Sequence, residues 1–306
     1  MASEAKKTSA LKKLTKGLTV GSVMTSSTFF HGPPVLALGF TKLFKKSKTV
    51  DETNIKITNS WLSVNNWLID HVLPNTKWNI EIEEGLDLSM QGRYLMTCNH
   101  QSWVDTTVNQ YFGLTRMPLT RFFTKWELIF IPFVGQAFKI LGFPMMKRHT
   151  KEQIAKKPEL KDRDMQEARK SCEQLLSQPF TLLNYLEGTR FTPEKHAKQQ
   201  SPYQNLLQPK AGGLALALNI LGQEIDALVD MTIVYPDGVP GYGEFWLGEV
   251  PRIAVNLRKI EIPEWVLQGN YEDDAEHRQK FQEWVHQIWT EKDQLIQRMK
   301  TSLATQ

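Results

Sequence analysis

Short apolar runs alternate with segments of helical periodicity along the middle of this chain. Residues 93–99 and 180–186 are rich in strand-forming residues, and residues 106–111 can continue from the first run as a helix. Apolar positions recur at helical spacing over 162–177 and again over about 273–303. We therefore expect an α/β fold, with a mixed sheet flanked by helices.

Residues 18–40 have a different pattern, because they include no Asp, Glu, Lys or Arg. About 20 such residues can span a bilayer. Six Ser or Thr residues dilute the hydrophobicity, however, and Gly32, Pro33 and Pro34 are expected to break a helix midway. With lysines at both ends, the segment predicts a helix-break-helix hairpin that dips into one leaflet, with a full span as the alternative.

Charge is distributed unevenly between the N-terminus and the rest of the chain. The first 50 residues carry nine lysines and one acidic residue, Glu4, which gives +8; the total is +4, so the remaining residues sum to −4. A basic segment of this kind favours an anionic lipid surface over nucleic acid as its partner. We predict no nucleic-acid partner and a membrane-associated N-terminal helical hairpin.

The most informative chemistry follows the first predicted strand, where His100 and Asp105 stand five positions apart. His100 would lie at the carboxyl end of that strand, and ligands of open α/β sheets bind at this edge. Ser102 and Asp105 also have the spacing of a helix capping box. On these residues alone, two interpretations are possible: an acid-base pair and a structural helix cap.

A second charged motif follows the second predicted strand. The turn consists of Glu187, Gly188, Thr189 and Arg190. Gly188 allows a tight turn and close approach of a ligand, and Arg190 offers a planar fork suited to phosphate or carboxylate. Because two strands deliver charged residues to the start of a loop, the sequence predicts that the two motifs form one site.

These motifs together resemble the glycerolipid acyltransferase family, whose best-known members are the lysophosphatidic acid acyltransferases (1-acylglycerol-3-phosphate O-acyltransferases). Five blocks follow in the family's order over about residues 90–240, roughly half of the chain. The blocks are residues 99–105, 125–148, 187–192, 209–213 and 229–236. Together with the charge distribution, this predicts an acyltransferase domain over 51–306, with its motifs at about 90–240, and the basic membrane-associated motif over 1–50.

The resemblance implies transfer of a fatty acyl group from a thioester to the free hydroxyl of a lysophospholipid, without a covalent enzyme intermediate or a cofactor. The acceptor would be lysophosphatidic acid, the product phosphatidic acid, and the donor acyl-coenzyme A or acyl carrier protein. His100 suits the role of general base, since the unperturbed pKa of histidine is about 6.5. Asp105 would fix the imidazole tautomer and stabilise the imidazolium.

The other expected contacts of the substrate are Lys125, Arg148, Glu187, Gly188, Thr189, Arg190 and Lys210. The resemblance implies phosphate contacts for Arg190, Lys125 and Arg148, while Lys210 is a candidate because it precedes Gly212 and Gly213 closely. For Glu187 we expect that it orients Arg190 or binds the glycerol hydroxyl, with a structural turn contact as the alternative.

Other features limit the chemistry. Ser102 is expected to cap a helix and Cys98 to pack in a strand, so neither is predicted as a nucleophile. The chain has two cysteines and no cluster of metal-binding residues, which predicts a reducing compartment and no metal. Residues 129–143 are apolar on more faces than a surface helix needs, and would line an acyl-chain pocket or belong to the core.

We therefore expect an enzyme that binds membrane phospholipids on the cytoplasmic face of a membrane, such as the bacterial inner membrane. Three alternatives stay open: transfer to another lysolipid acceptor, a thioesterase that uses water as the acceptor, and a non-catalytic protein that binds a lipid surface. The intact set of His100, Asp105, Glu187 and Arg190 argues against the last of these.

Overall fold

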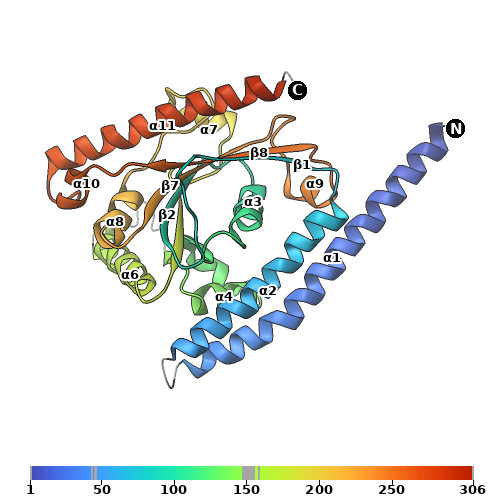
Figure 1. Cartoon of the computed structure of the whole chain (residues 1–306), viewed down its shortest axis with the longest axis horizontal. Coiled ribbons are helices and arrows are strands. Elements are labelled where there is room, and N and C mark those ends of the chain that lie inside the picture. The colour runs from blue at the N-terminus through green and yellow to red at the C-terminus, as the bar shows by residue number, and fades with distance from the viewer. Residues whose placement is uncertain (1, 43, 45–46, 147–155, 158, 305–306) are drawn as a thin grey trace.

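The computed structural model describes residues 2–42, 44, 47–146, 156–157 and 159–304. Within these residues, a six-stranded sheet has helices on both faces, and two long N-terminal helices lie to one side of it (Figure 1). The strand order is β1-β8-β7-β2-β6-β3. The strands are β1 (Lys77–Ile82), β2 (Arg93–Cys98), β3 (Thr120–Phe122), β6 (Phe180–Tyr185), β7 (Ala227–Val234) and β8 (Arg252–Ile260).

The sheet is mixed, as the sequence predicted. Strands β3, β6, β2 and β7 run parallel, β8 is antiparallel to β7, and β1 is parallel to β8. At the carboxyl ends of the parallel strands, Cys98 is paired with Tyr185 on one side and with Met231 on the other. The loops that follow β2, β6 and β7 therefore begin at the same edge of the sheet.

Two hydrophobic layers cover the sheet. Helices α6 (Glu159–Leu175), α8 (Gly212–Leu221) and α11 (Ala275–Ala304) pack on one face, and α3 (Val104–Gly113) packs on the other (Figure 1). Along β2, Leu95 belongs to the first core, whereas Tyr94 and Met96 belong to the second. Strands buried on both faces read as continuous apolar runs, which explains why β2 and β6 were predictable.

The N-terminal helices correct one prediction. Helix α1 (Ala2–Thr41) continues through Pro33 and Pro34, so the break expected at these residues is wrong. The hairpin is instead formed by α1 and α2 (Lys48–Val72), which lie side by side (Figure 1). Helix α2 also contributes Leu68 and Ile69 to the core beneath the sheet. The division of the chain at residue 50 is untested and stays a prediction.

Tertiary packing accounts for the unbroken helix. A Cβ atom at Gly32 would lie 2.8 Å from Cβ of Phe133, and one at Gly39 would lie 2.4 Å from Ile140, so both glycines allow α1 to approach α4 (Val134–Ile140) closely. Prolines in a helix interior cost roughly 3 kcal/mol, a penalty that packing of this extent can offset. Among the described helices, none is both long and apolar enough to cross a bilayer.

The apolar stretch at 129–143 forms the end of a 3₁₀ helix and all of α4. Phe130, at the end of η1 (Trp126–Phe130), is 77% exposed, whereas Ala137 and Leu141 are buried. The stretch is therefore part core and part surface. The remaining elements are β4 (Thr124–Lys125), β5 (Met145–Met146), α7 (Pro193–Gln199), α9 (Tyr242–Trp246) and α10 (Glu264–Gln268).

Candidate active site

The two charged motifs meet at the carboxyl edge of the sheet. The backbone N–H of His100 donates to Oε1 of Glu187 at 2.7 Å, and the N–H of Phe191 donates to the carbonyl of His100 at 2.7 Å. Asn99, which is fully buried, exchanges two hydrogen bonds with the backbone of Ile233 in β7. These bonds fix the backbone of His100 from both neighbouring strands.

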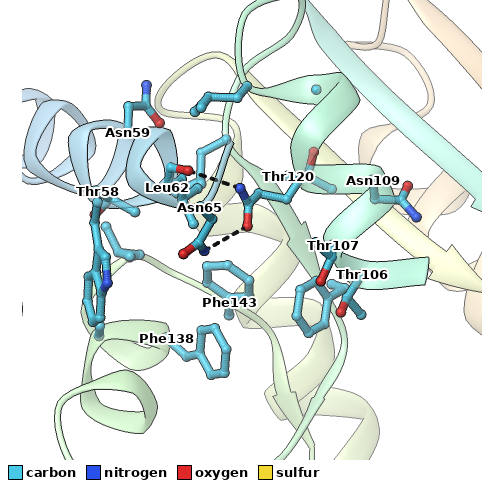
Figure 2. Close-up of a pocket in the computed structure, with 18 of the residues that line it drawn as sticks. Thr58, Asn59, Leu62, Asn65, Thr106, Thr107, Asn109, Thr120, Phe138 and Phe143 are labelled. Carbon is cyan, nitrogen blue, oxygen red and sulfur yellow. Dashed lines mark hydrogen bonds between the residues drawn. The ribbon is translucent and has the colours of Figure 1, made fainter. Parts of the chain in front are cut away.

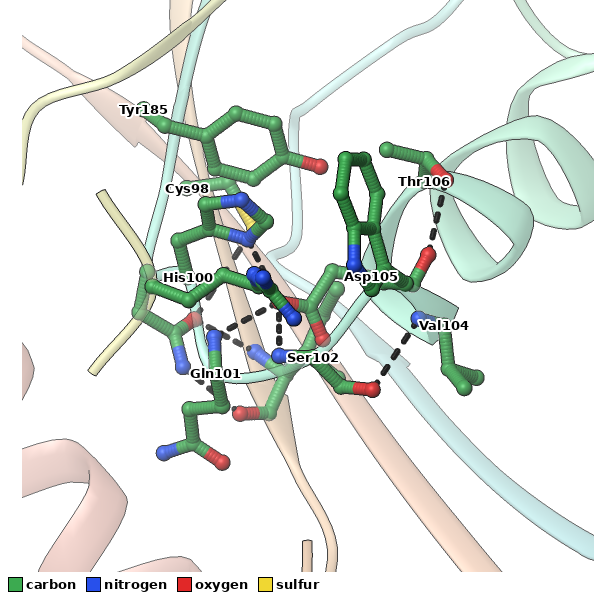
Figure 3. Close-up of polar contacts among 12 residues, drawn as sticks. Cys98, His100, Gln101, Ser102, Val104, Asp105, Thr106 and Tyr185 are labelled. Carbon is green, nitrogen blue, oxygen red and sulfur yellow. Dashed lines mark hydrogen bonds and ion pairs between the residues drawn. The ribbon is translucent and has the colours of Figure 1, made fainter. Parts of the chain in front are cut away.

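His100 and Asp105 form the expected pair. Nδ1 of His100 lies 2.9 Å from Oδ2 of Asp105, and the imidazole stacks on Tyr185 with ring centroids 4.0 Å apart (Figure 3). The His100 side chain is 14% exposed and that of Asp105 is 1% exposed. A carboxylate at Nδ1 favours the tautomer that carries its proton there, which leaves Nε2 as the basic nitrogen.

Asp105 has a structural role in addition to this contact. Its Oδ2 accepts hydrogen bonds from the backbone N–H groups of Gln101, at 2.6 Å, and of Ser102, at 2.9 Å. The hydroxyl of Ser102 in turn accepts from the N–H of Val104. Asp105 therefore has both roles: it caps the start of the helix and it pairs with His100. The capping bonds hold the carboxylate in the position that faces His100.

Two tyrosines of the site were not predicted from the sequence. Tyr235, directly after β7, donates its O–H to Oδ1 of Asp105 at 2.7 Å, and Tyr185 at the end of β6 supplies the stacking ring. Burial, followed by the nearby charge of Asp105, raises the pKa of Tyr235 well above its usual value, so the phenol stays a donor. Their sequence positions could have indicated a place in the site, since both residues lie where parallel strands end.

Replacing Tyr235 with phenylalanine should lower kcat about tenfold, because a buried carboxylate oxygen loses its hydrogen-bond donor. The melting temperature should change little, since the ring is kept. Tyr111→Phe is the matched control: its hydroxyl bonds Asp70, away from the site. Steady-state kinetics check this prediction, and equal kcat values for the two variants would contradict it.

Glu187 is fully buried, so its side chain is not placed to contact the substrate, contrary to the expectation from the sequence. Its Oε1 accepts from the N–H of His100 and its Oε2 from the N–H of Leu207, at 3.0 Å. Burial raises the pKa of Glu187 to about 7, although these two bonds and the charge of Lys292 oppose the rise. The structure thus gives this carboxylate the turn contact that was the alternative, and no bond to Arg190 is present among the described residues.

The rest of the turn after β6 is held by a lysine that the motif analysis missed. Gly188 has a φ of +66°, a conformation that glycine adopts without strain. Nζ of Lys195, in α7, donates to the hydroxyl of Thr189 at 2.7 Å and to the carbonyl of Arg190 at 2.9 Å. The Thr189 hydroxyl therefore already has a donor, and Lys195 fixes the backbone that presents Arg190.

Two of the four predicted cations lie at this edge. The guanidinium of Arg190 stacks on Trp103, 4.6 Å from the ring centroid, and makes no hydrogen bond or ion pair within the described ranges. The Lys210 amine lies over Gly188, where an added Cβ would be 3.2 Å from Nζ. Trp103 is 54% exposed and Arg190 is half-buried, so the stacked pair lies at the protein surface.

The other two cations are not placed in the site. Lys125 is exposed at the end of β4, and no contact joins it to His100 or Arg190 in the part of the chain that the structure describes. Arg148 lies outside the described residues. Their phosphate contacts stay predictions.

Neither alternative nucleophile is available. The hydroxyl of Ser102 donates to the carbonyl of Pro240 at 2.6 Å, and the residue is 4% exposed. Burial raises the pKa of the Cys98 thiol far above its usual value, which leaves no reactive thiolate. Among the residues with described positions, no group of His, Cys, Asp and Glu side chains could hold a metal ion.

The sequence model of the acyltransferase family matches residues 79–236, just over half of the chain. The chain belongs to the acyltransferase family. The matched region contains His100, Asp105 and the turn after β6, so the family predicted from these motifs is confirmed.

Known acyltransferases similar to this one include several that act on lysolipids. The 2-acyl-1-lysophosphatidylinositol acyltransferase of Saccharomyces cerevisiae is 33% identical over 139 residues, which cover 39% of this chain and 33% of the yeast protein. The 1-acyl-sn-glycerol-3-phosphate acyltransferase epsilon of Mus musculus is 25% identical over 223 residues, 65% of this chain and 55% of the mouse protein. This chain thus spans a third to just over half of these two relatives.

A solved acyltransferase shows that the fold is shared. The crystal structure of the 1-acyl-sn-glycerophosphate (LPA) acyltransferase PlsC from Thermotoga maritima superimposes with a TM-score of 0.55 at 16% identity. The match covers 94% of this chain and 98% of that one. The predicted α/β architecture, a mixed sheet flanked by helices, is therefore confirmed.

Proposed function

We propose that this acyltransferase moves a fatty acyl group from an acyl thioester to the free hydroxyl of a lysophospholipid. The observation that carries the proposal is the buried His100–Asp105 pair, whose Nε2 lies at the same sheet edge as the guanidinium of Arg190; within the described residues neither group makes a hydrogen bond. A base and an anion-binding group at one site suit an acceptor that has both a hydroxyl and a phosphate.

The chemistry needs only one proton carrier. As the acceptor oxygen bonds to the thioester carbonyl carbon, its proton moves to Nε2 of His100, and Asp105 stabilises the imidazolium. The carbon-sulfur bond of the tetrahedral intermediate then breaks, and the imidazolium returns the proton to the departing thiolate. The thioester is already activated, so no covalent enzyme intermediate is required, whether the carrier is coenzyme A or acyl carrier protein.

A cavity beside the site supports a long acyl chain as part of the substrate. It has a volume of about 320 Å³ and lies between α2, α3 and α4. Figure 2 shows Thr106 and Asn109 of α3 on one side of it, with Phe138 and Phe143 below. Because Asn109 also bonds the carbonyl of Asp105 at 2.8 Å, this mostly apolar space begins one helical turn from Asp105, the partner of the base.

The acceptor that we favour is lysophosphatidic acid, which the mouse relative's name also specifies, as 1-acyl-sn-glycerol-3-phosphate. The yeast relative, which has the higher identity over a shorter match, favours lysophosphatidylinositol as a second candidate. Both acceptors carry a phosphate group, for which Arg190 and Lys210 are the proposed partners.

Replacing Arg190 with alanine should raise the KM for lysophosphatidic acid about tenfold, because a charge-assisted phosphate contact is lost. The rate of thioester hydrolysis without acceptor should not change, since Arg190 does not contact His100. Arg190→Lys should recover part of the affinity, and Arg169→Ala, on α6, is a control outside the site. Acylation of lysophosphatidic acid and of lysophosphatidylinositol, measured side by side, checks this; an unchanged KM for both would rule out the phosphate contact.

For the location, we propose that α1 binds an anionic membrane surface. Leu11, Leu14, Leu18, Phe29 and Phe40 are each 59% exposed or more, and their spacings are close to whole helical turns. These side chains form one apolar stripe along α1, on the same helix as most of the lysines of the basic segment. We therefore propose that the protein binds the cytoplasmic leaflet of a membrane, such as the bacterial inner membrane.

Substituting Phe29, in this stripe, and its exposed neighbour Phe30 together by glutamate should lower the fraction bound to vesicles containing phosphatidylglycerol at least tenfold, because each Phe that the membrane buries contributes roughly 1.5–3 kcal/mol. Both side chains are more than 60% exposed, so the fold should persist. Met90→Glu, at an exposed position in the loop before β2, is the control. Flotation assays give the bound fraction, and the account of α1 fails if the double variant floats like the control.

A further inference from the structure

Helix α11 lies beyond the region that matches the family. It runs along one face of the sheet (Figure 1), and the side chain of its residue Trp289 is completely buried. Its inward face is not only apolar. Four of its polar side chains, at spacings of 3, 4 and 7 residues, bond one irregular segment between α7 and α8. We name these four the α11 clasp: His286, Trp289, Asp293 and Lys300.

The α11 clasp contacts residues 203–207. The indole N–H of Trp289 donates to the carbonyl of Leu207 at 3.0 Å. Asp293 accepts from the backbone N–H groups of Gln204 at 2.8 Å and Asn205 at 2.7 Å. Nζ of Lys300 also donates to Oδ1 of Asn205, at 2.6 Å, and the Tyr203 hydroxyl lies 2.7 Å from Nδ1 of His286.

These contacts lead directly to the base. Residues 203–207 belong to no helix or strand, so their position depends on side-chain bonds. The carbonyl of Leu207 is held by Trp289, and its N–H donates to Oε2 of Glu187. The other oxygen of Glu187 accepts the N–H of His100. Three consecutive hydrogen bonds thus connect α11 with the backbone of His100.

A second connection comes from beneath the sheet. Nζ of Lys292 on α11 is fully buried and lies 2.9 Å from Oδ1 of Asp230, an atom that also accepts from the hydroxyl of Thr97 at 2.6 Å. Thr97 lies three residues before His100 on β2. The charge of Lys292 also lowers the pKa of Glu187, whereas Asp105 raises it.

We propose that α11 is a positioning element of the active site, in which Trp289 and Asp293 hold residues 203–207 so that Leu207 fixes Glu187 and Glu187 fixes His100. This inference rests on the proposed function for its kinetic consequence, but not for the hydrogen bonds. The competing interpretation is that α11 stabilises the fold by burying Trp289 and has no effect on the base. The two interpretations differ in what loss of the indole N–H alone would do.

Trp289→Phe removes the N–H while keeping an aromatic ring in the core. Trp284→Phe is the matched control, because Trp284 is on the same helix and packs on Phe281 without an indole hydrogen bond to residues 203–207. We expect kcat to fall about three- to tenfold in Trp289→Phe, with KM unchanged for both substrates. The acid limb of the kcat profile should move to higher pH, because a less firmly held Leu207 bonds Glu187 more weakly and the buried carboxylate then holds its proton more tightly.

Asp293 gives an independent check within the same segment. Asp293→Ala should reduce kcat similarly, and Asp293→Asn should restore part of it because the amide keeps one acceptor oxygen. If Trp289→Phe behaves like Trp284→Phe and Asp293→Ala like wild type, α11 has only a structural role.

A spectroscopic measurement separates this inference from the proposed reaction. With isotope-labelled histidine, the chain gives seven histidine amide signals, and the His100 signal is identified by its loss in a His100 variant. Its amide proton shift reports the bond to Glu187 and should move upfield in Trp289→Phe but not in Trp284→Phe. If wild type lacks acyl transfer but this shift moves as expected, the function is wrong and the positioning stands; an unmoved shift overturns the positioning.

Discussion

His100→Ala should lower the rate of acyl transfer by 10² to 10⁴, the usual contribution of a general base. Only 14% of the side chain is exposed, but among the described residues its ring makes one hydrogen bond, to Asp105, and stacks on Tyr185, so the fold should survive its loss. Binding of the acyl thioester should not change, because the imidazole acts on the acceptor proton. Acyl transfer is followed by product formation from labelled lysophosphatidic acid.

The controls for this variant come from the same chain. His71→Ala removes an exposed imidazole on α2 whose hydrogen bond, to the carbonyl of Trp67, lies within the same helix, and should leave the rate as in wild type. Asp105→Asn should lose nearly as much activity as His100→Ala. Its Oδ2 accepts from three N–H groups and its Oδ1 from a hydroxyl, and an amide group cannot accept at both positions. A His100→Ala variant with more than a tenth of wild-type activity would exclude this residue as the base.

Glu187→Gln should lower kcat by about 10- to 100-fold, with little change in KM for either substrate. The carboxylate accepts one backbone N–H on each oxygen in a fully buried position. Glutamine would place its NH₂ group against one of these donors, and an unsatisfied buried pair costs roughly 1–3 kcal/mol. Because the side chain is not exposed, its loss should affect the position of His100 and not substrate affinity.

The pH dependence of wild type gives a second test of Glu187. Its pKa in the folded state is raised to about 7, mainly by burial, from an unperturbed value of 4.5. The folded state therefore binds more protons than the unfolded state between these values, so this group adds stability as the pH falls from 7 towards 4.5. The activity should change in the opposite direction, since both backbone bonds require the ionised form.

Chemical unfolding and kcat, measured from pH 8 to 5, check the sign of both effects. Glu187→Gln should lose the part of the stability gain that wild type shows on acidification, and Glu83→Gln is a control, because Glu83 lies in an exposed position after β1. A stability curve for Glu187→Gln parallel to that of wild type would show that Glu187 does not titrate in this range.

The part of the site that could be predicted from the sequence consists of residues that directly follow buried strands. Strands β2 and β6 read as continuous apolar runs, so the loops that begin with Asn99 and Leu186 could be assigned to one edge. The partners of these residues come from distant segments. Tyr235 and Leu207 reach Asp105 and Glu187 through the strand order and the loop after α7, which a single sequence does not encode in its periodicity.

The N-terminus illustrates the opposite case, in which local preference was overruled. Pro33 and Pro34 favour a helix break, but Gly32 and Gly39 bring α1 against Phe133 and Ile140, and this packing keeps the helix continuous. For Glu187, the charged motif suggested contact with substrate. Its complete burial could be recognised only from the structure, because a loop start at a sheet edge can point inward or outward.

The measurement that tests the central claim most directly is thiol release from a long-chain acyl-coenzyme A by the purified chain, with and without lysophosphatidic acid. The proposed function predicts that release depends on the lysolipid and that each thiol released is matched by one molecule of phosphatidic acid. Equal release without lysolipid would mean that water is the acceptor and that the enzyme is a thioesterase. No release with lysophosphatidic acid, lysophosphatidylinositol or an acyl carrier protein donor would contradict an acyltransferase activity for this chain.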